Sequence, residues 1–210
     1  MSEFASILII IAPFLLGLFV IWRLTWRKQR GRQGETRLSD FVGRKDVLIL
    51  DTETTGLYKS AEILEIAIID TTGTMRYSAP VMPKGRVLTE ASDIHGLTRR
   101  ELRKLGAQPW PDHHHSIASL LEGAVVIGWN IDFDVRMLHQ TCDKYDLEPP
   151  VFRILDLLAV YRERRKRRRN RLTDAIRDEG LATTGDLHRA ETDCRAVLAV
   201  LRKLAADVAS

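Results

Sequence analysis

The feature that most constrains this chain is an apolar run near its amino terminus. From Phe4 to Trp22 the chain has 19 residues without an ionisable side chain. A helix of that length would be roughly 28 Å long, which matches the ~30 Å hydrocarbon core of a bilayer. Pro13 and Gly17 would weaken a helix in water but are tolerated within membrane spans. The run therefore predicts a single transmembrane helix over residues 4–22.

The segments that flank this run predict its type and its orientation. A cleaved secretory signal should have a basic leader and a small-residue cleavage site, whereas this chain begins MSE and continues after the run with WRLTWRKQRGR. A buried core helix is the other alternative. Because the cations follow the span, the positive-inside rule predicts a single-pass anchor in the cell membrane with the carboxyl-terminal domain in the cytoplasm. Cys142 and Cys194 are too few for a disulfide scaffold and are expected to be free thiols, which suits that compartment.

The rest of the chain is expected to form a tether and one folded domain. Residues 23–45 are basic or polar and lack strong periodicity, which predicts a juxtamembrane tether. Residues 46–206 have the length of one ordinary domain. The chain is 45% hydrophobic and 29% charged, which excludes collagen-like, low-complexity and globally disordered classes.

Short apolar runs bounded by turn residues predict strands, and helical spacing dominates the second half of the chain. The expected strands are 47–50, 63–69, 75–83 and 124–129. The expected helices are 112–122, 133–145, 153–165, 171–179 and 190–206. Three strands followed by a fourth among helices predict an α/β domain with one mixed sheet flanked by helices.

Acidic residues stand at the ends of the expected elements. Asp51 and Glu53 follow the strand 47–50 and project from the same face, because strand side chains alternate. Two anions this close need a compensating cation, and Mg²⁺ or Mn²⁺ prefers such oxygen ligands. Asp134 is expected in the first turn of a helix that follows the strand 124–129. Taken singly, a solvated strand end or an ordinary helix amino terminus is the commoner explanation.

His188 and Asp193 stand near the start of the last expected helix. A separation of five residues turns a helix by ~500°, so the two side chains cannot share one face and His188 is expected in the preceding loop. From there its imidazole could take a proton from a water held near Asp193 at about neutral pH. The alternative is an ordinary surface histidine.

Taken together, these motifs resemble the DEDDh (DnaQ-like) 3′-to-5′ exonucleases, the family of the proofreading epsilon subunit of bacterial DNA polymerase III. The resemblance covers about residues 46–206 and rests on DTETTG, IHGLT, GWNIDFDVRML and HRAETD. It implies an RNase H-like mixed sheet and the hydrolysis of nucleic acid from its 3′ end.

The resemblance also implies roles for individual residues. The metal ligands would be Asp51, Glu53, Asp134 and Asp193. They would hold two Mg²⁺ or Mn²⁺ ions, with Asp51 bridging the ions, Glu53 orienting the attacking water and His188 as the general base. The residues implied to contact the 3′-terminal nucleotide are Thr54, Leu57, His95 and Phe133.

Several further features leave alternatives open. Trp129 stands where family members often have histidine, and it could stack on a base or sugar of the substrate or only close the core. The run Arg162–Arg171 holds eight cations and one acid. It could follow the phosphate backbone, bind anionic lipid beside the anchor, or form a solvated helix face. Asp156 and the consecutive histidines 113–115 are expected to be structural, since three adjacent residues cannot all face one metal ion.

The sequence therefore predicts a membrane-anchored, two-metal exonuclease that releases nucleoside monophosphates from single-stranded nucleic acid, with DNA favoured. An RNA-trimming or oligoribonucleotide-degrading enzyme is one alternative. A non-catalytic nucleic-acid-binding module of the same fold is the other. The sequence predicts no particular protein partner.

Overall fold

The computed structural model describes residues 37–166, 171–182 and 187–207 of the chain. The predicted transmembrane helix over 4–22 lies outside these ranges, as does most of the predicted tether. Within the described ranges, no helix is both long enough and apolar enough to cross a bilayer. The compact unit that carries the described elements begins at Leu38.

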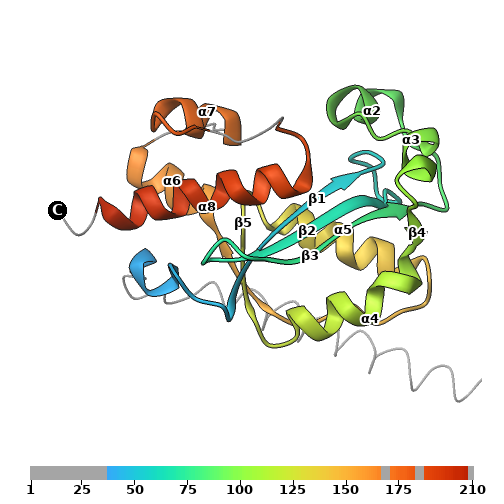
Figure 1. Ribbon diagram of the computed structural model, residues 1–210, viewed down its shortest axis with the longest axis horizontal. Coiled ribbons are helices and arrows are strands. Elements are labelled where there is room, and N and C mark those ends of the chain that lie inside the picture. The colour runs from blue at the N-terminus through green and yellow to red at the C-terminus, as the bar shows by residue number, and fades with distance from the viewer. Residues whose placement is uncertain (1–36, 167–170, 183–186, 208–210) are drawn as a thin grey trace, which may run out of the picture. The chain divides into compact units, whose positions relative to one another are not determined.

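One six-stranded mixed sheet forms the centre of this unit, in the order β4-β3-β2-β1-β5-β6 (Figure 1). Its strands are β1 (Val47–Thr54), β2 (Ile63–Asp70), β3 (Met75–Met82), β4 (Gln108–Pro109), β5 (Val125–Gly128) and β6 (Arg153–Asp156). β1 is central, because it pairs antiparallel with β2 and parallel with β5. Every residue of β2 is buried, as expected of a strand whose two faces are both covered.

Helices cover both faces of the sheet. The helical elements are the 3₁₀ turn η1 (Leu38–Phe41), α2 (Thr89–His95), α3 (Arg99–Lys104), α4 (Trp110–Leu121), α5 (Asp132–Asp143), α6 (Leu157–Arg165), α7 (Leu172–Asp178) and α8 (Ala190–Ala206). α8 packs on one face together with η1, α6 and α7, whereas α4 and α5 pack on the other face (Figure 1).

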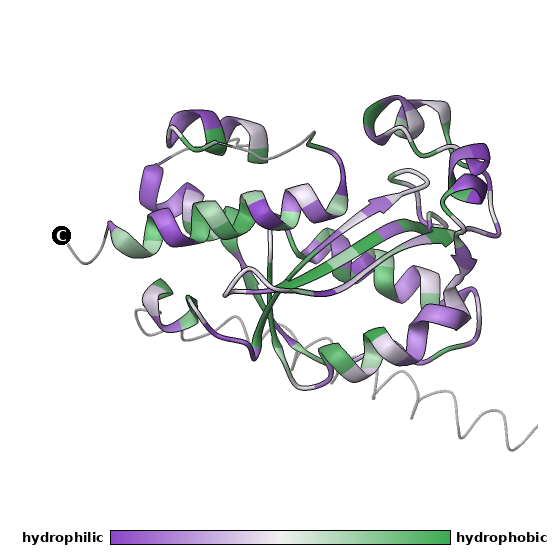
Figure 2. Cartoon of the chain, in the orientation of Figure 1, coloured by the Kyte–Doolittle hydropathy of each residue, from purple (hydrophilic) through white to green (hydrophobic). Residues whose placement is uncertain are grey.

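The alternation of side chains along β1 divides the apolar residues between two cores. Val47 and Ile49 point into the core beneath α8, and Leu48 and Leu50 point into the core beneath α4 and α5. Figure 2 shows hydrophobic residues concentrated along the central strands. The predicted α/β class with a mixed sheet is confirmed, and the four predicted strands correspond to β1, β2, β3 and β5.

The prediction of one helix over 153–165 is wrong in its first part. Arg153–Asp156 forms the edge strand β6, which pairs parallel with β5. Helix α6 begins only at Leu157, and the Asp156 carboxylate accepts a hydrogen bond from the Leu158 N–H as its cap. A short apolar segment is compatible with the residue spacing of a helix or of a strand, and here the pairing with β5 makes it a strand.

The two short helices α2 and α3 and the two-residue strand β4 were not expected. Each of these helices buries a single side chain, His95 in α2 and Leu102 in α3. One buried residue gives no detectable helical period in the sequence. The omission matters, because α2 positions His95 beside the end of β1.

The folded unit begins before the predicted boundary at Asp46. Leu38 is only 2% exposed and belongs to the core beneath α8. The Thr71 hydroxyl donates to the Phe41 carbonyl at 2.6 Å, and the Gly43 N–H donates to the Thr71 carbonyl at 3.3 Å. These contacts make residues 38–45 part of the domain rather than of the tether.

We expect Leu38→Ala to lower the free energy of unfolding by about 2–4 kcal/mol, because it deletes buried methyl groups and leaves a cavity. The matched control is Ser39→Ala at the exposed neighbouring position, with an expected change below about 0.5 kcal/mol. Urea unfolding followed by circular dichroism measures both. Equal stability of the two variants would place residues 38–45 outside the cooperative fold.

Candidate active site

The predicted metal ligands come from three elements. Asp51 and Glu53 lie near the carboxyl end of β1, and both are partly buried. Asp134 lies in the first turn of α5, and Asp193 lies in the first turn of α8, as expected from the sequence. Each helix therefore brings one carboxylate to the strand that supplies the other two.

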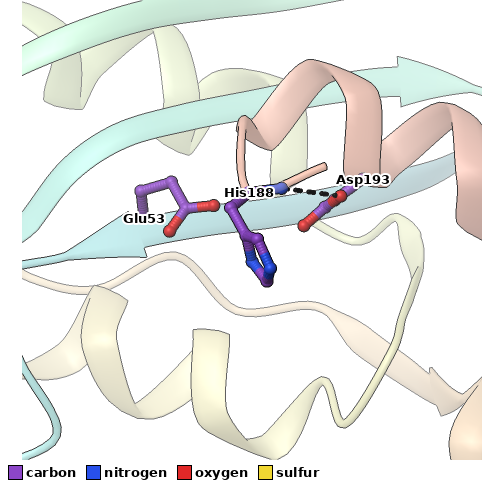
Figure 3. A group of neighbouring side chains, drawn as sticks. All are labelled: Glu53, His188 and Asp193. Carbon is purple, nitrogen blue, oxygen red and sulfur yellow. Dashed lines mark hydrogen bonds between the residues drawn. The ribbon is translucent and has the colours of Figure 1, made fainter. Parts of the chain in front are cut away.

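Glu53, His188 and Asp193 form a close cluster (Figure 3). One possible ligand atom from each of the three side chains lies within 4.8 Å of the other two. The backbone N–H of His188 donates to Asp193 Oδ1 at 3.3 Å. His188 is exposed, has a φ of 70° and precedes α8, which confirms that it lies in the loop before the helix.

Asp51 is electrostatically linked to the other acids. Burial raises the pKa of Asp51 well above its ordinary value, and the negative charges of Asp134 and Asp193 raise it further. Burial also raises the pKa of Glu53 to about 8, with the charge on Asp193 as the next cause. Asp51 thus interacts electrostatically with the other three acids, although the 4.8 Å cluster itself includes neither Asp51 nor Asp134.

Asp134 is held in place by a residue that the sequence reasoning missed. The Thr52 hydroxyl donates to Asp134 Oδ1 at 2.7 Å, and Asp134 is only 3% exposed. Burial raises the pKa of Asp134 to about 7, and the hydrogen bond from Thr52 opposes that rise. A threonine between two acids gives no signal in the sequence, because its side chain leaves the strand on the opposite face from theirs.

Glu65 is a second missed residue, and it fixes the start of α8. Glu65 is 6% exposed and stands opposite Glu53 in the β1–β2 register. Its carboxylate accepts hydrogen bonds from Arg189 Nη2 at 2.6 Å and from the Ala190 N–H at 3.0 Å. These bonds hold the chain on the carboxyl side of His188. A lone acid inside the apolar run ILEIAII is the signal that could have revealed it.

The residues expected to contact the terminal nucleotide differ in their surroundings. His95 is buried, accepts the Leu97 N–H at Nδ1 and donates from Nε2 to the Thr54 carbonyl, and burial lowers its pKa. Both of its ring nitrogens are therefore used by the backbone. The Thr54 hydroxyl donates to the Gly56 carbonyl. Leu57 is 78% exposed, and Phe133 is half-buried with the Arg136 guanidinium over its ring.

Trp129 packs against the protein interior, as expected if this side chain closes the core. Its ring centroid lies 5.4 Å from that of Tyr161, and the half-buried side chain adjoins the core beneath α8.

Asp156 accepts hydrogen bonds from the Asn130 and Leu158 N–H groups, which agrees with the expected structural role. The His113 ring bonds to the Tyr77 hydroxyl at 2.8 Å.

The basic run Arg162–Arg171 lies only partly within the described ranges, because residues 167–170 are outside them. Arg164 donates to the Leu204 carbonyl at 2.7 Å. Arg165 binds Glu179 at 2.6 Å and also pairs with Asp207. These two cations hold α6 against the end of α8, so not every cation of the run is a free surface charge.

The donor set fits hard divalent cations. Asp51, Glu53, Asp134 and Asp193 would supply carboxylate oxygens, which Mg²⁺ and Mn²⁺ prefer. Arg189 lowers the pKa of Glu53, but its guanidinium is already bound to Glu65. A pair of divalent cations would offset the repulsion among the four acids.

Comparison with known proteins places the chain in a family. A family model described as "Exonuclease" (RNase_T) matches residues 48–201. "Uncharacterized exonuclease CP81" of Escherichia phage 186 is 35% identical over 173 residues, which cover 76% of this chain and 88% of the phage protein. The chain therefore belongs to this exonuclease family, which is of the DEDDh type.

Solved structures share the fold at lower identity. Exonuclease X in complex with 5′ overhanging duplex DNA has a TM-score of 0.61 at 21% identity, covering 77% of this chain and 92% of its own. The nuclease domain of 3′hExo, a DEDDh family member bound to rAMP, has a TM-score of 0.63 at 17% identity, covering 78% and 94%. These likenesses confirm the predicted RNase H-like architecture.

We expect the metal-free protein to lose stability as the pH rises. The pKa values of Glu53, about 8, and Asp134, about 7, lie above the unfolded values of about 4. Between about pH 4 and pH 8 the folded state therefore binds more protons than the unfolded state, so the free energy of unfolding falls with rising pH. Thermal unfolding in EDTA across that range measures the effect, and Mg²⁺ should reverse it by binding the folded state.

Glu53→Gln is the variant that isolates this effect, since it removes one of the repelling charges. It should raise the melting temperature in EDTA at high pH and weaken the response to Mg²⁺. Glu90→Gln, at an exposed glutamate on α2, is the matched control and should behave as the unmodified protein does. The same pH dependence and Mg²⁺ response in both variants would contradict the expected repulsion at Glu53.

Proposed function

We propose that this exonuclease acts in the 3′-to-5′ direction and releases nucleoside monophosphates from single-stranded nucleic acid, with DNA favoured. The observation that carries the proposal is the cluster of Glu53, His188 and Asp193 within 4.8 Å, with which the partly buried Asp51 interacts electrostatically. Family membership supplies the reaction class. The direction, the strand form and the sugar are the proposed part.

The proposed reaction is hydrolysis of the terminal phosphodiester. The oxygen of a water bonds to phosphorus, the P–O3′ bond breaks, and the nucleotide leaves with a 5′-phosphate while the shortened strand keeps a 3′-hydroxyl. His188 accepts the proton of the water, since its imidazole is exposed and only its backbone N–H binds Asp193. Divalent cations on the four carboxylates would supply charge neutralisation at the phosphate and activation of water.

The preference for DNA follows from the resemblance of the motifs to those of proofreading exonucleases. The two solved structures point to different ligands, since Exonuclease X is bound to DNA and 3′hExo to rAMP. An RNA-trimming enzyme therefore stays as the competing proposal. A module of the same fold without activity would need no cluster of acids and imidazole such as this one.

The full chain, purified in a nonionic detergent, should release labelled mononucleotide from a 3′-labelled DNA strand at once, and progressively shorten a 5′-labelled one. Release should require Mg²⁺ or Mn²⁺ and stop in EDTA. A matched RNA strand tests the sugar preference, and faster loss of the RNA would replace DNA as the substrate. Absence of any metal-dependent release would favour the non-catalytic module.

In the same assay, His188→Ala should slow release by ~10² or more, the usual effect of losing a general base. Asp51→Ala and Asp193→Ala should abolish release while the protein stays folded by circular dichroism. His115→Ala, which removes an exposed histidine of α4, is the matched control and should keep the unmodified rate. An unchanged rate in His188→Ala would refute its role as the base.

We also propose that residues 4–22 anchor the chain in the cell membrane as a single pass, with the exonuclease domain on the cytoplasmic side. The support is the run of 19 residues without ionisable side chains and the five cations within residues 23–32. The run Arg162–Arg171 would add a contact to anionic lipid.

The anchor predicts that the full chain stays with the membrane pellet after an alkaline wash. A variant that lacks residues 4–22 should appear in the supernatant instead. Protease added outside intact spheroplasts should leave the domain uncut in the full chain, because the domain would be inside. The same fractionation for both chains, or external cleavage of the domain, would disprove the anchor or its orientation.

A further inference from the structure

A cavity of about 290 Å³ lies among α2, α3 and the loop that precedes α2. Its lining residues are Arg86, Val87, Thr89, Ser92, Thr98 and Arg99. Two of them carry guanidinium groups, three carry hydroxyl groups, and none is acidic. This lining suits a small anion with several oxygen acceptors.

Both arginines have N–H donors that form no hydrogen bond with a described residue. Arg99 Nη1 donates to the carbonyls of Pro83 at 2.8 Å and Gly85 at 2.7 Å, which fixes its guanidinium in the cavity wall. Nε and Nη2 of Arg99 make no hydrogen bond within the described part of the chain. The exposed Arg86 side chain likewise has no ion pair or hydrogen bond to any residue described.

The hydroxyl groups of the lining could provide further hydrogen-bond donors. Thr98 Oγ1 accepts the Glu101 N–H at 3.2 Å, so its own proton is left for donation to a ligand. The Ser92 hydroxyl is used differently, because it donates to the Thr89 carbonyl at 2.9 Å. Thr98 is therefore better suited than Ser92 to donate to an anion.

The loop that carries Arg86 is held by a buried carboxylate. Glu62 accepts the N–H groups of Lys84 at 2.9 Å and Gly85 at 2.7 Å, and its side chain is 1% exposed. Lys144 pairs with Glu62 at 2.7 Å and balances its charge. The Tyr58 hydroxyl donates to the Arg86 carbonyl at 3.2 Å. The cavity wall is thus fixed before any ligand binds.

The same elements connect the cavity to the candidate active site. The Leu88 N–H donates to the Thr55 carbonyl at 3.1 Å, just beyond Glu53 on the chain. At the other end of α2, His95 bonds to the Thr54 carbonyl at 3.1 Å. Figure 1 shows α2 and α3 near the carboxyl end of β1. α2 is ~10 Å long, a distance that about three stacked nucleotides span.

We propose that this cavity is a phosphate subsite that holds a phosphodiester group of the substrate strand, upstream of the terminal nucleotide. This inference rests on the proposed function. Arg86 and Arg99 would bind the phosphate oxygens, and the Thr98 hydroxyl would donate to them. Such contacts carry no base information, so the subsite would position strands of any sequence.

The test compares two substrates of the full chain. One is a ten-nucleotide DNA strand, and the other is the p-nitrophenyl ester of thymidine 5′-monophosphate, which has no upstream phosphate. In Arg86→Gln the ratio of kcat/KM for the strand to kcat/KM for the ester should fall about tenfold, through KM for the strand. The slope of log KM against log salt should also decrease by about 0.7 for the lost phosphate contact.

Two further variants complete the test. Ser92→Asp places a negative charge in the cavity and should lower the same ratio at least as much. Arg100→Gln removes an exposed arginine that neighbours Arg99 but does not line the cavity, and it should leave the ratio unchanged. Thermal unfolding checks that each variant is folded.

The possible results separate the alternatives. Ratios within twofold of the unmodified protein in folded Arg86→Gln and Ser92→Asp would overturn the subsite. If Arg86→Gln keeps the ratio but weakens inhibition of ester hydrolysis by inorganic phosphate, the cavity binds free phosphate and the assignment to the strand is wrong. If the unmodified chain cleaves neither substrate, the proposed function itself fails, and the subsite fails with it.

Discussion

The repulsion among four gathered carboxylates is the constraint that the rest of this domain has to accommodate. Burial and mutual charge raise the pKa of Asp51 and of Glu53, so the site is unfavourable as long as no cation neutralises it. The sheet can hold these groups because β1 is central and packs into a separate apolar core on each face. The two cores stabilise the sheet, whereas the acids near the carboxyl end of β1 lower its stability.

Two buried hydrogen-bonding residues turn this arrangement into a defined geometry. Thr52 lies on the face of β1 opposite to Asp51 and Glu53, and its hydroxyl orients Asp134. Glu65 binds Arg189 and so fixes the start of α8. The second contact sets where the loop containing His188 ends, so the imidazole is positioned by its neighbours along the chain rather than by a bond to its own ring. His188 is exposed and Asp193 is partly buried, although only five positions separate them along the chain.

The sequence was sufficient for the central strands, the α/β class and the element boundaries that carry the four acids, because apolar runs and polar strand ends are strong local signals. The sequence was insufficient where contacts between distant segments determine the secondary structure or the burial of a residue. Arg153–Asp156 became a strand only because β5 lies beside it, and Leu38 joined the core from an otherwise polar segment. Thr52 and Glu65 act through contacts between distant parts of the chain; Thr52 has no local signal, and the lone acid in the apolar run around Glu65 does not show which residues it binds.

The last helix joins two tasks in one rigid element, and this limits how its length can change. Asp193 faces the site from the first turn of α8, while Val197 and Leu201 anchor the same helix in the core. Inserting or deleting one residue between them would rotate one group relative to the other by about 100°. The helix would then lose either its anchoring side chains or its carboxylate. Because Leu204 is also buried in that core, viable length variation is confined to the part of α8 beyond Leu204 or to the loops outside the helix.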